Sequence, residues 1–366
     1  MRLIHCADIH LDSKMTANLT PQKAKERKNE ILNTFVSMVD YAVGNDVDGI
    51  LIAGDMFDTG SVSALARNTV RDAIIMHPDI DFYYLKGNHD RDSFLATLEE
   101  IPDNLKLFSE SWQSYSAGEE SKVIITAIEL APSNSGSCYN ELVLDPSDIN
   151  IVMLHGQESE SYSKDKAEVI NLRELKNKNI DYLALGHIHG YKEASLDGRG
   201  KYCYPGCLEG RGFDELGTHG FVVLDIDEEA HKVDSTFVPF AFREMVELDV
   251  DISGIESTSD IVLRIDDSIY GESIEAKNLL KIVLTGEVDI ECEKDIDYLV
   301  KHYEPLFYFV KIYDESKLKI SYEDYKLDAS LKGEFVRRVM DSKMSEGDKM
   351  AVIRIGLQAI AGEEIQ

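Results

Sequence analysis

The 366-residue sequence has few cysteines, a single tryptophan and only eight prolines. The five cysteines are an odd number at scattered positions, which argues against a disulfide framework and favours a reducing, cytoplasmic setting. No run of about 18 apolar residues occurs, so we expect no transmembrane helix and no membrane partner. The apolar stretch at the N-terminus is too short for a signal peptide. With 43% hydrophobic residues, the composition is typical of a globular protein with a sizeable core.

Basic residues are also scarce. The chain has 38 lysines and arginines against 68 aspartates and glutamates, a net charge of −30. A protein that binds nucleic acid by itself usually carries a basic face, so this composition argues against strong stand-alone affinity for DNA. It does not exclude DNA as a substrate, because bound divalent cations and a basic partner can offset the negative field locally.

The length and the changes of pattern along the chain predict more than one domain. Residues 1–240 alternate short apolar runs with amphipathic stretches and later become richer in strands. This pattern predicts an α/β sandwich of two sheets flanked by helices. Residues 241–325 read as a small α/β domain, and residues 326–366 as a C-terminal helical hairpin.

Polar residues of the kind that bind metals follow the apolar runs of the first region. Each occurs where a predicted strand gives way to a loop, and strand ends in an α/β sheet are where ligands gather. Glycines at 54, 87, 156, 186 and 190 flank them and permit tight turns and close approach of the backbone. The candidate ligands are Asp8, His10, Asp55, Asn88, His155, His187 and His189.

This set mixes carboxylates, imidazoles and an amide. Such a mixture suits Mn²⁺, Fe²⁺ or Zn²⁺ better than Mg²⁺ or Ca²⁺, which prefer shells of oxygen atoms only. A carboxylate can bridge two cations, and two neighbouring metals can polarise a phosphoryl oxygen and acidify a water molecule. The residues therefore predict a two-metal hydrolytic centre. His5 lies inside an apolar strand and is expected to be a core residue, and no function is assigned to His77, His219, His231 or His302.

The same segments resemble the signature of calcineurin-like metallophosphoesterases. The resemblance covers the whole of the first region, and it implies that one metal ion takes Asp8, His10, Asp55 and His189. The second ion then takes Asp55, Asn88, His155 and His187, with Asp55 as the bridge. The segments that carry the resemblance are Asp8-x-His10, Gly54-Asp55-x-x-Asp58, Gly87-Asn88-His89-Asp90, His155 and Gly186-His187-x-His189.

The resemblance also implies a catalytic role for His89, which is similar to a histidine of the family that is not a ligand. That histidine stabilises the transition state or protonates the leaving oxygen, work that suits an imidazole because its pKa lies near neutrality. Asp58 and Asp90 are then expected to orient ligands. An aspartate that only forms a turn or a cap is an equally good interpretation of each.

A narrower resemblance links the chain to SbcD-type DNA repair nucleases, in their YhaO-like branch. It implies a DNA exonuclease and endonuclease subunit that uses Mn²⁺, forms a homodimer and works with an SbcC-like coiled-coil ATPase. It also implies that residues 241–325 form a capping domain. The carrying segments are residues 4–12, Tyr204-Pro205-Gly206-Cys207, where Cys207 stands in place of the usual serine, and residues 242–245, 331–335 and 355–363.

Three matters stay open at the level of sequence. The helical hairpin either docks on the ATPase through Phe335, Val339, Ile353 and Leu357, by the logic of a helix in a groove, or packs on its own chain. The substrate is either DNA or a small molecule or phosphoprotein, while a non-catalytic scaffold is disfavoured because every expected ligand is present. Basic residues near the motifs either meet DNA phosphates or are ordinary surface charges: Lys14, Arg91, Arg199, Lys201 and Arg211, with the run Lys23, Lys25, Arg27 and Lys28.

Overall fold

The structure is a computed structural model, and it describes residues 1–15, 18–58, 62–90, 95, 98, 100–118, 121–159, 168–289, 292–319 and 325–361. The chain forms two compact units, Met1–Met245 and Val246–Gln366. The division into three domains that the sequence suggests, at residues 240 and 325, stays a prediction. No helix within the described ranges is long and apolar enough to cross a bilayer.

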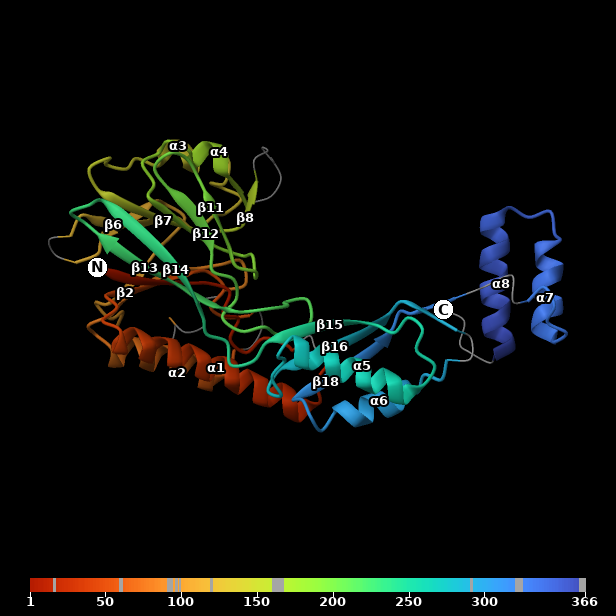
Figure 1. The fold of residues 1–366 in the computed structure, drawn as a ribbon. Helices are drawn as coiled ribbons and strands as arrows, with labels where there is room; N and C mark the ends of the chain where they lie inside the picture. The colour runs from red at the N-terminus through yellow and green to blue at the C-terminus, as the bar shows by residue number, and fades with distance from the viewer. Residues whose placement is uncertain are drawn as a thin grey trace. The chain divides into compact units, whose positions relative to one another are not determined.

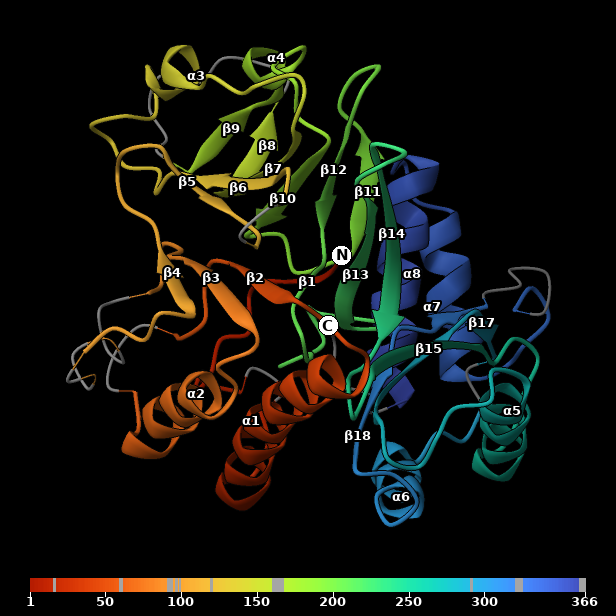
Figure 2. The same cartoon turned by 90° about the vertical axis from the view of Figure 1, so that its left-hand side faces the viewer.

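The first unit contains two six-stranded sheets (Figures 1 and 2). In the first sheet, β1 to β4 run parallel to one another. On the other side of β1, β13 pairs antiparallel with β1, and β14 pairs antiparallel with β13. All four parallel strands therefore deliver their C-terminal ends to one edge of the sheet. The sheet order is β14 (Lys232–Pro239), β13 (Gly220–Asp227), β1 (Arg2–Cys6), β2 (Gly49–Ala53), β3 (Asp81–Leu85) and β4 (Leu105–Leu107).

The second sheet has a parallel centre with an antiparallel strand at each side. Its order is β11 (Lys192–Ser195), β12 (Lys201–Tyr204), β10 (Tyr182–Gly186), β7 (Ile149–His155), β6 (Val123–Ala127) and β5 (Gln113–Ser116). A short parallel pair, β8 (Gln157–Ser159) and β9 (Val169–Asn171), follows β7 in the chain. The C-terminal ends of β7 and β10 lie in register, with His155 beside Gly186.

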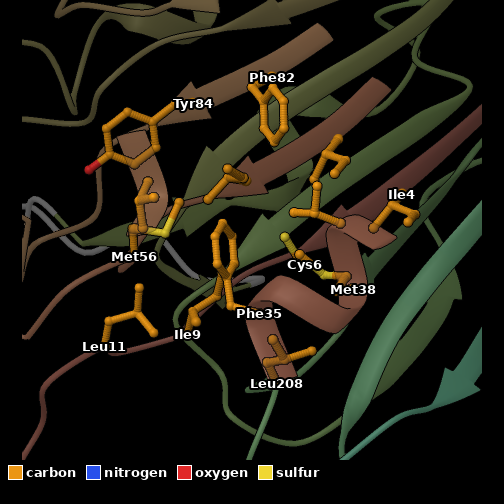
Figure 3. Packing of buried hydrophobic residues seen from close by; sticks show 14 of the residues in the cluster. Ile4, Cys6, Ile9, Leu11, Phe35, Met38, Met56, Phe82, Tyr84 and Leu208 are labelled. Atoms are coloured by element: carbon orange, nitrogen blue, oxygen red, sulfur yellow. The ribbon is translucent and has the colours of Figure 1, made fainter. Parts of the chain in front are cut away.

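Successive side chains of a strand point to opposite faces of its sheet, and in the buried strands both sets are apolar. One set can therefore pack against the other sheet. Leu3, Leu51 and Tyr83 of the first sheet share a core cluster with Ile151 and Tyr182 of the second. The intervening residues of the first sheet pack in the opposite direction, against helices. Figure 3 shows this second cluster, in which Phe35 and Met38 lie close to the strand residues Ile4 and Cys6.

Helices cover the outer face of each sheet. The first sheet is covered by α1 (Pro21–Gly44) and α2 (Ala64–Met76), which begin where the side chains of Thr20 and Ser63 accept hydrogen bonds from the first turn. The second sheet is covered by α3 (Cys138–Glu141) and α4 (Leu172–Leu175). Figure 2 shows these layers in order, from α3 and α4 through both sheets to α1 and α2. The predicted two-sheet α/β sandwich is confirmed.

The second unit has its own apolar core. A three-stranded sheet is formed by β15 (Met245–Asp251), β16 (Leu279–Thr285) and β18 (Phe309–Asp314), with β16 in the centre. Two helices, α5 (Thr258–Gly271) and α6 (Ile296–Tyr303), supply Ile261, Ile265 and Leu299 to the same core. A short parallel pair, β17 (Glu287–Val288) and β19 (Lys317–Leu318), completes the strands.

The C-terminal helices α7 (Leu331–Met340) and α8 (Glu346–Ala361) pack against each other. Val336, Val339, Ile353 and Leu357 are buried in a cluster of their own, with Phe335 packed against it. Phe335, Val339, Ile353 and Leu357 already pack in the core of the hairpin. They therefore do not form an exposed face on which a partner could dock. Docking of the ATPase on this segment stays a prediction.

Candidate metal centre

The candidate ligands of the first unit come together at the C-terminal ends of five parallel strands. Asp8 and His10 follow β1, and Asp55 follows β2. Asn88 lies in the loop after β3, while His155 is the last residue of β7 and His187 and His189 follow β10. The structure thereby unites residues that are up to 181 positions apart in the sequence, because both sheets present this edge to the same place.

The backbone at the centre adopts an unusual conformation. Asp8, His10 and Asp55 have φ angles of 51°, 48° and 53°, in the left-handed region that residues with a side chain seldom occupy. Two hydrogen bonds hold them there: Asp8 N–H donates to Gly54 O and His10 N–H to Asp55 O, both at 3.0 Å. Such conformations cost about 1–3 kcal/mol each and cluster at functional sites. No sequence pattern had pointed to this strain.

Close packing requires four of the flanking glycines: Gly54, Gly87, Gly156 and Gly186. A Cβ atom on Gly54 would lie 2.1 Å from the His155 ring, and one on Gly87 would lie 2.1 Å from Asp55 Oδ1. Any side chain at either position would displace a candidate ligand. The expectation was wrong for Gly190, where a Cβ atom would meet nothing within 4 Å.

One group of ligand atoms is formed by Asp8, His10 and His189. Each offers an atom within 4.8 Å of the others. The Nε2 atoms of His10 and His189 face each other at 3.2 Å. Two imidazole nitrogens and a carboxylate directed at one point form a donor set that suits a transition-metal ion.

A second group is formed by Asp8, Asp55 and His155. Asp55 Oδ2 lies 3.3 Å from His155 Nε2 and 3.8 Å from His10 Nε2, so this carboxylate stands between the two groups. Asn88 Oδ1 adds a further oxygen, 3.0 Å from His155 Nε2. Asp8 belongs to both groups, so two carboxylates lie near both sets of atoms, and the bridging role of Asp55 stays a prediction.

The ring of His155 is oriented by the backbone. Its Nδ1 lies 2.9 Å from Ala53 O, to which it donates a hydrogen bond, so Nε2 faces the carboxylates. His187 is placed differently: its backbone N–H donates to both oxygens of Asp8, at 3.0 and 2.9 Å. The His187 ring stands edge-on to that of His155, with ring centroids 5.4 Å apart.

The electrostatics of the centre differ from residue to residue. Burial raises the pKa of Asp8 to about 6 and lowers that of His10 to about 3. Burial would also lower the pKa of His155, but its hydrogen bond with Asp55 and the charge of Asp8 raise it to about 9. The protein thus attracts a proton to the point between Asp8, Asp55 and His155. A divalent cation would supply that charge more effectively, so these residues fit a metal.

His89 lies beside the ligands without being one of the two groups above. Its backbone N–H donates to Asp55 Oδ1 at 2.9 Å, and its Nδ1 lies 3.0 Å from Asp58 Oδ1. The side chain is 38% exposed, so its other nitrogen is accessible to a substrate. His89 and Asp58 also form a third close group with His10. The hydrogen bond between His89 and Asp58 accounts for this closeness without a further metal ion.

The two neighbouring aspartates separate into different roles. Asp58 lies 3.0 Å from Nδ1 of His89 and so orients a ring that is not an expected ligand, whereas the expectation was that Asp58 orients a ligand. Asp90 accepts hydrogen bonds from the backbone N–H groups of Met56, Phe57 and Gly87, and so ties the loop after β2 to the loop after β3. Asp90 therefore stabilises the loops that present the ligands.

Sequence reasoning missed Glu215. Its Oε1 lies 2.7 Å from Nδ1 of His189, and Arg211 holds the same carboxylate. Glu215 belongs to no motif and lies 26 residues from His189, so local spacing gave no signal. A metal-binding histidine usually donates its second ring N–H to an acceptor, and this rule alone could have predicted a partner such as Glu215.

Several of the basic residues that were open candidates for contact with DNA phosphates are bound to carboxylates. Arg211 pairs with Glu215, Arg199 with Asp181 at 2.8 Å, and Lys201 lies 3.5 Å from Glu193. Arg27 of the basic run is fully buried and bonds to Glu30 and Glu209. Lys14 is exposed, and Arg91 lies outside the described residues. The basic run is therefore not a uniform face for phosphates.

Comparisons with known proteins agree with this centre. Residues 1–191 match the family model for calcineurin-like phosphoesterases. The uncharacterized metallophosphoesterase YhaO of Bacillus subtilis (strain 168) is 30% identical over 243 residues, which cover 62% of this chain and 57% of that protein. The DNA double-strand break repair protein Mre11 of Sulfolobus acidocaldarius is 22% identical over 358 residues, which cover 89% of this chain and 85% of that protein.

A shorter match concerns the SbcD component of the nuclease SbcCD of Escherichia coli (strain K12). It is 30% identical over 105 residues, which cover 28% of this chain and 24% of that protein. The chain thus spans little more than half the length of YhaO, most of Mre11 and about a quarter of the SbcCD component.

Proposed function

Because the chain belongs to the calcineurin-like phosphoesterase family, we propose that it is a two-metal nuclease that hydrolyses phosphodiester bonds in DNA. The observation that supports this most directly is the placement of Asp55 between two groups of ligand atoms, with the His89–Asp58 pair alongside. The DNA substrate is supported by the relatives, two of which are described as a DNA repair protein and a component of a nuclease.

We assign the ligands as the resemblance suggested. One ion would be held by Asp8, His10, Asp55 and His189, and the other by Asp55, Asn88, His155 and His187. Such ions would supply polarisation of the phosphoryl oxygens and acidification of a water molecule. Mn²⁺ is the proposed metal, with Fe²⁺ or Zn²⁺ as alternatives, because the donor set mixes nitrogen and oxygen.

His89 is the proposed catalytic residue. Its Nδ1–H donates to Asp58, which holds the ring in one orientation and leaves Nε2 free for the substrate. In the protonated form, His89 can stabilise the negative charge of the transition state and donate a proton to the leaving oxygen.

The remaining partners belong to the same proposal. Low stand-alone affinity for DNA, which the net charge of −30 predicts, is consistent with a subunit that works with an SbcC-like coiled-coil ATPase. A homodimer is the proposed assembly, by resemblance to the SbcD-type family. Co-purification of the chain from its own cells tests the partner: an ATPase of this class should accompany it.

The central experiment measures cleavage of linear duplex and single-stranded DNA by the purified chain with Mn²⁺, with and without the ATPase. His89→Ala should reduce the rate by about 10²–10⁴-fold while Mn²⁺ binding persists, because the ring is not a ligand. His77→Ala, at the end of α2, is the matched control and should cleave normally. Wild-type protein that leaves every DNA intact with Mn²⁺ and the partner would refute the nuclease.

A second candidate is a phosphoesterase for small molecules or phosphoproteins. It is favoured by the net charge and by the pairing of Arg199, Lys201 and Arg211 with carboxylates. Comparison of a small aryl phosphodiester with duplex DNA separates the two. A steep loss of DNA cleavage with added salt would indicate phosphate contacts and support the nuclease.

A further inference from the structure

His189 and His155 differ in what holds their rings. His155 donates from Nδ1 to a neutral backbone carbonyl, Ala53 O, at 2.9 Å. His189 has the carboxylate of Glu215 at the corresponding position, with 2.7 Å between Nδ1 and Oε1. A carboxylate acceptor makes an imidazole a stronger ligand than a carbonyl does and fixes its ring in one orientation. The two candidate metal positions therefore have different supports.

Glu215 is buried, with 6% of its surface exposed. Arg211 donates from its backbone N–H to Oε2 at 2.7 Å and from Nε to Oε1 at 3.0 Å. Both carboxylate oxygens therefore act as acceptors, so His189 carries its proton on Nδ1, donates it to Oε1 and presents a lone pair at Nε2.

This tautomer holds although Arg211 Nη2 also lies 3.1 Å from His189 Nδ1. If that nitrogen were an acceptor, it would face an accepting oxygen of Glu215 at 2.7 Å with no proton between them, which is repulsive. The lone pair at Nε2 is directed toward Nε2 of His10, 3.2 Å away, where the first ligand group meets.

The backbone of Glu215 is held from two sides. Its N–H donates to Gly212 O at 3.0 Å, and Nε2 of His219 lies 3.0 Å from its carbonyl oxygen. Since that histidine nitrogen donates, Nδ1 of His219 accepts, and the thiol of Cys207 lies 3.3 Å from it. His219 and Cys207 are both buried. A continuous chain of contacts thus leads from Cys207 through His219 and Glu215 to His189.

We propose that Glu215, clamped by Arg211, is a positioning residue that sets the affinity of the ion held through His189 separately from the ion held through His155. Glu215 acts through the ring of His189 rather than on the substrate. The inference rests on the metal centre of the proposed function but not on its DNA substrate. It also gives a role to the segment after β12, and to His219, to which the sequence had assigned none.

The test measures Mn²⁺ binding to the full chain by equilibrium dialysis. Wild-type protein should bind two equivalents. Glu215→Gln keeps the shape and one accepting oxygen but removes the charge, and it should weaken one equivalent by about 10–100-fold while the other is unchanged. Arg211→Ala should weaken the same equivalent. The matched control is Asp181→Asn, which breaks the Arg199 ion pair at the opposite end of β10 and should leave both equivalents intact.

The outcomes separate this inference from the nuclease. Unchanged binding of both equivalents by Glu215→Gln would overturn it, and so would equal weakening of both with a lowered melting temperature, which a purely structural role predicts. Glu215→Gln keeps the shape of the side chain, so it still tests the inference if Glu215→Ala does not fold. Wild-type protein that binds no Mn²⁺ would overturn the metal centre and this inference together. Two-step binding with selective loss in Glu215→Gln would support the inference even if DNA is not cleaved.

Discussion

The two units of the chain bury different kinds of side chain. In the first unit, Asp8, Asp55, His155, Arg27 and Glu209 are among many buried charged or polar residues. In the described parts of the second unit, Asn278 is the only buried residue whose side chain bears an amide or a charge. Burial of an ionisable group costs free energy unless the group is paired, so such groups persist where they serve chemistry. The difference indicates that the chemistry of this chain belongs to the first unit.

The largest expected effect follows from removal of the carboxylate between the two ligand groups. Asp55→Ala should abolish Mn²⁺ binding at both positions and lower phosphodiester hydrolysis by roughly 10³-fold or more, since metal catalysis contributes several kcal/mol. Mn²⁺ dialysis and hydrolysis of an aryl phosphodiester measure this. Asp249→Ala, an exposed carboxylate on β15 of the second unit, is the control and should change neither. Equal effects of the two variants would contradict the comparison.

The next largest effect tests whether the apolar cores of the two units unfold independently. Ile282 is fully buried in the central strand of the second unit, and Ile282→Ala should destabilise that unit by about 2–5 kcal/mol. The only tryptophan, Trp112, lies in the first unit and reports on it alone. The circular-dichroism transition in urea should therefore shift while the Trp112 fluorescence transition and Mn²⁺ binding do not. Ile151→Ala, in the core between the two sheets, should shift the fluorescence transition.

The smallest effect tests a buried polar group without a role in the chemistry. Burial lowers the pKa of His5 from its usual value near 6.5 to about 3, so the folded protein keeps it neutral while the unfolded chain binds a proton. Its contribution to stability is present above pH 6.5 and is lost as the pH falls toward 3. At pH 5 the loss should be about 2 kcal/mol.

His5→Gln should remove this part of the pH dependence while still offering Tyr182 a hydrogen-bond partner. Urea unfolding of metal-free wild-type and variant protein at pH 5 and pH 8 measures it. An identical difference between the two pH values in both proteins would show that His5 does not cause the loss.

Much of the fold could be predicted from local pattern. The alternation of apolar runs and amphipathic stretches expected in residues 1–240 is present as strands such as β2, β7 and β10 and as the helix α1. Short edge strands such as β5 and β11 give no such signal. Their residues are mostly exposed, so they carry no apolar run and form only because a neighbouring strand offers hydrogen-bond partners.

The assignment of basic residues shows the limit of composition. Arg27 lies in the most basic run of the chain, yet it is buried and bonds to Glu209, 182 residues away. Arg243, taken for the start of the capping domain, bonds to Glu30 of α1. Whether an arginine faces solvent or a buried carboxylate depends on partners distant in sequence, which local charge cannot reveal.

The sequence by itself determined the identity of the metal-type residues and their place at strand ends, because the alternation of apolar runs and polar tips is a local property. It also determined the family, through the spacing within each short motif. Only the tertiary structure decided that Asp55 stands between two ligand groups, that Glu215 rather than a backbone carbonyl supports His189, and that Arg211 serves Glu215 instead of an open surface. These facts depend on distances between segments that meet only after both sheets have packed, and they set which nitrogen of each histidine is free for a metal.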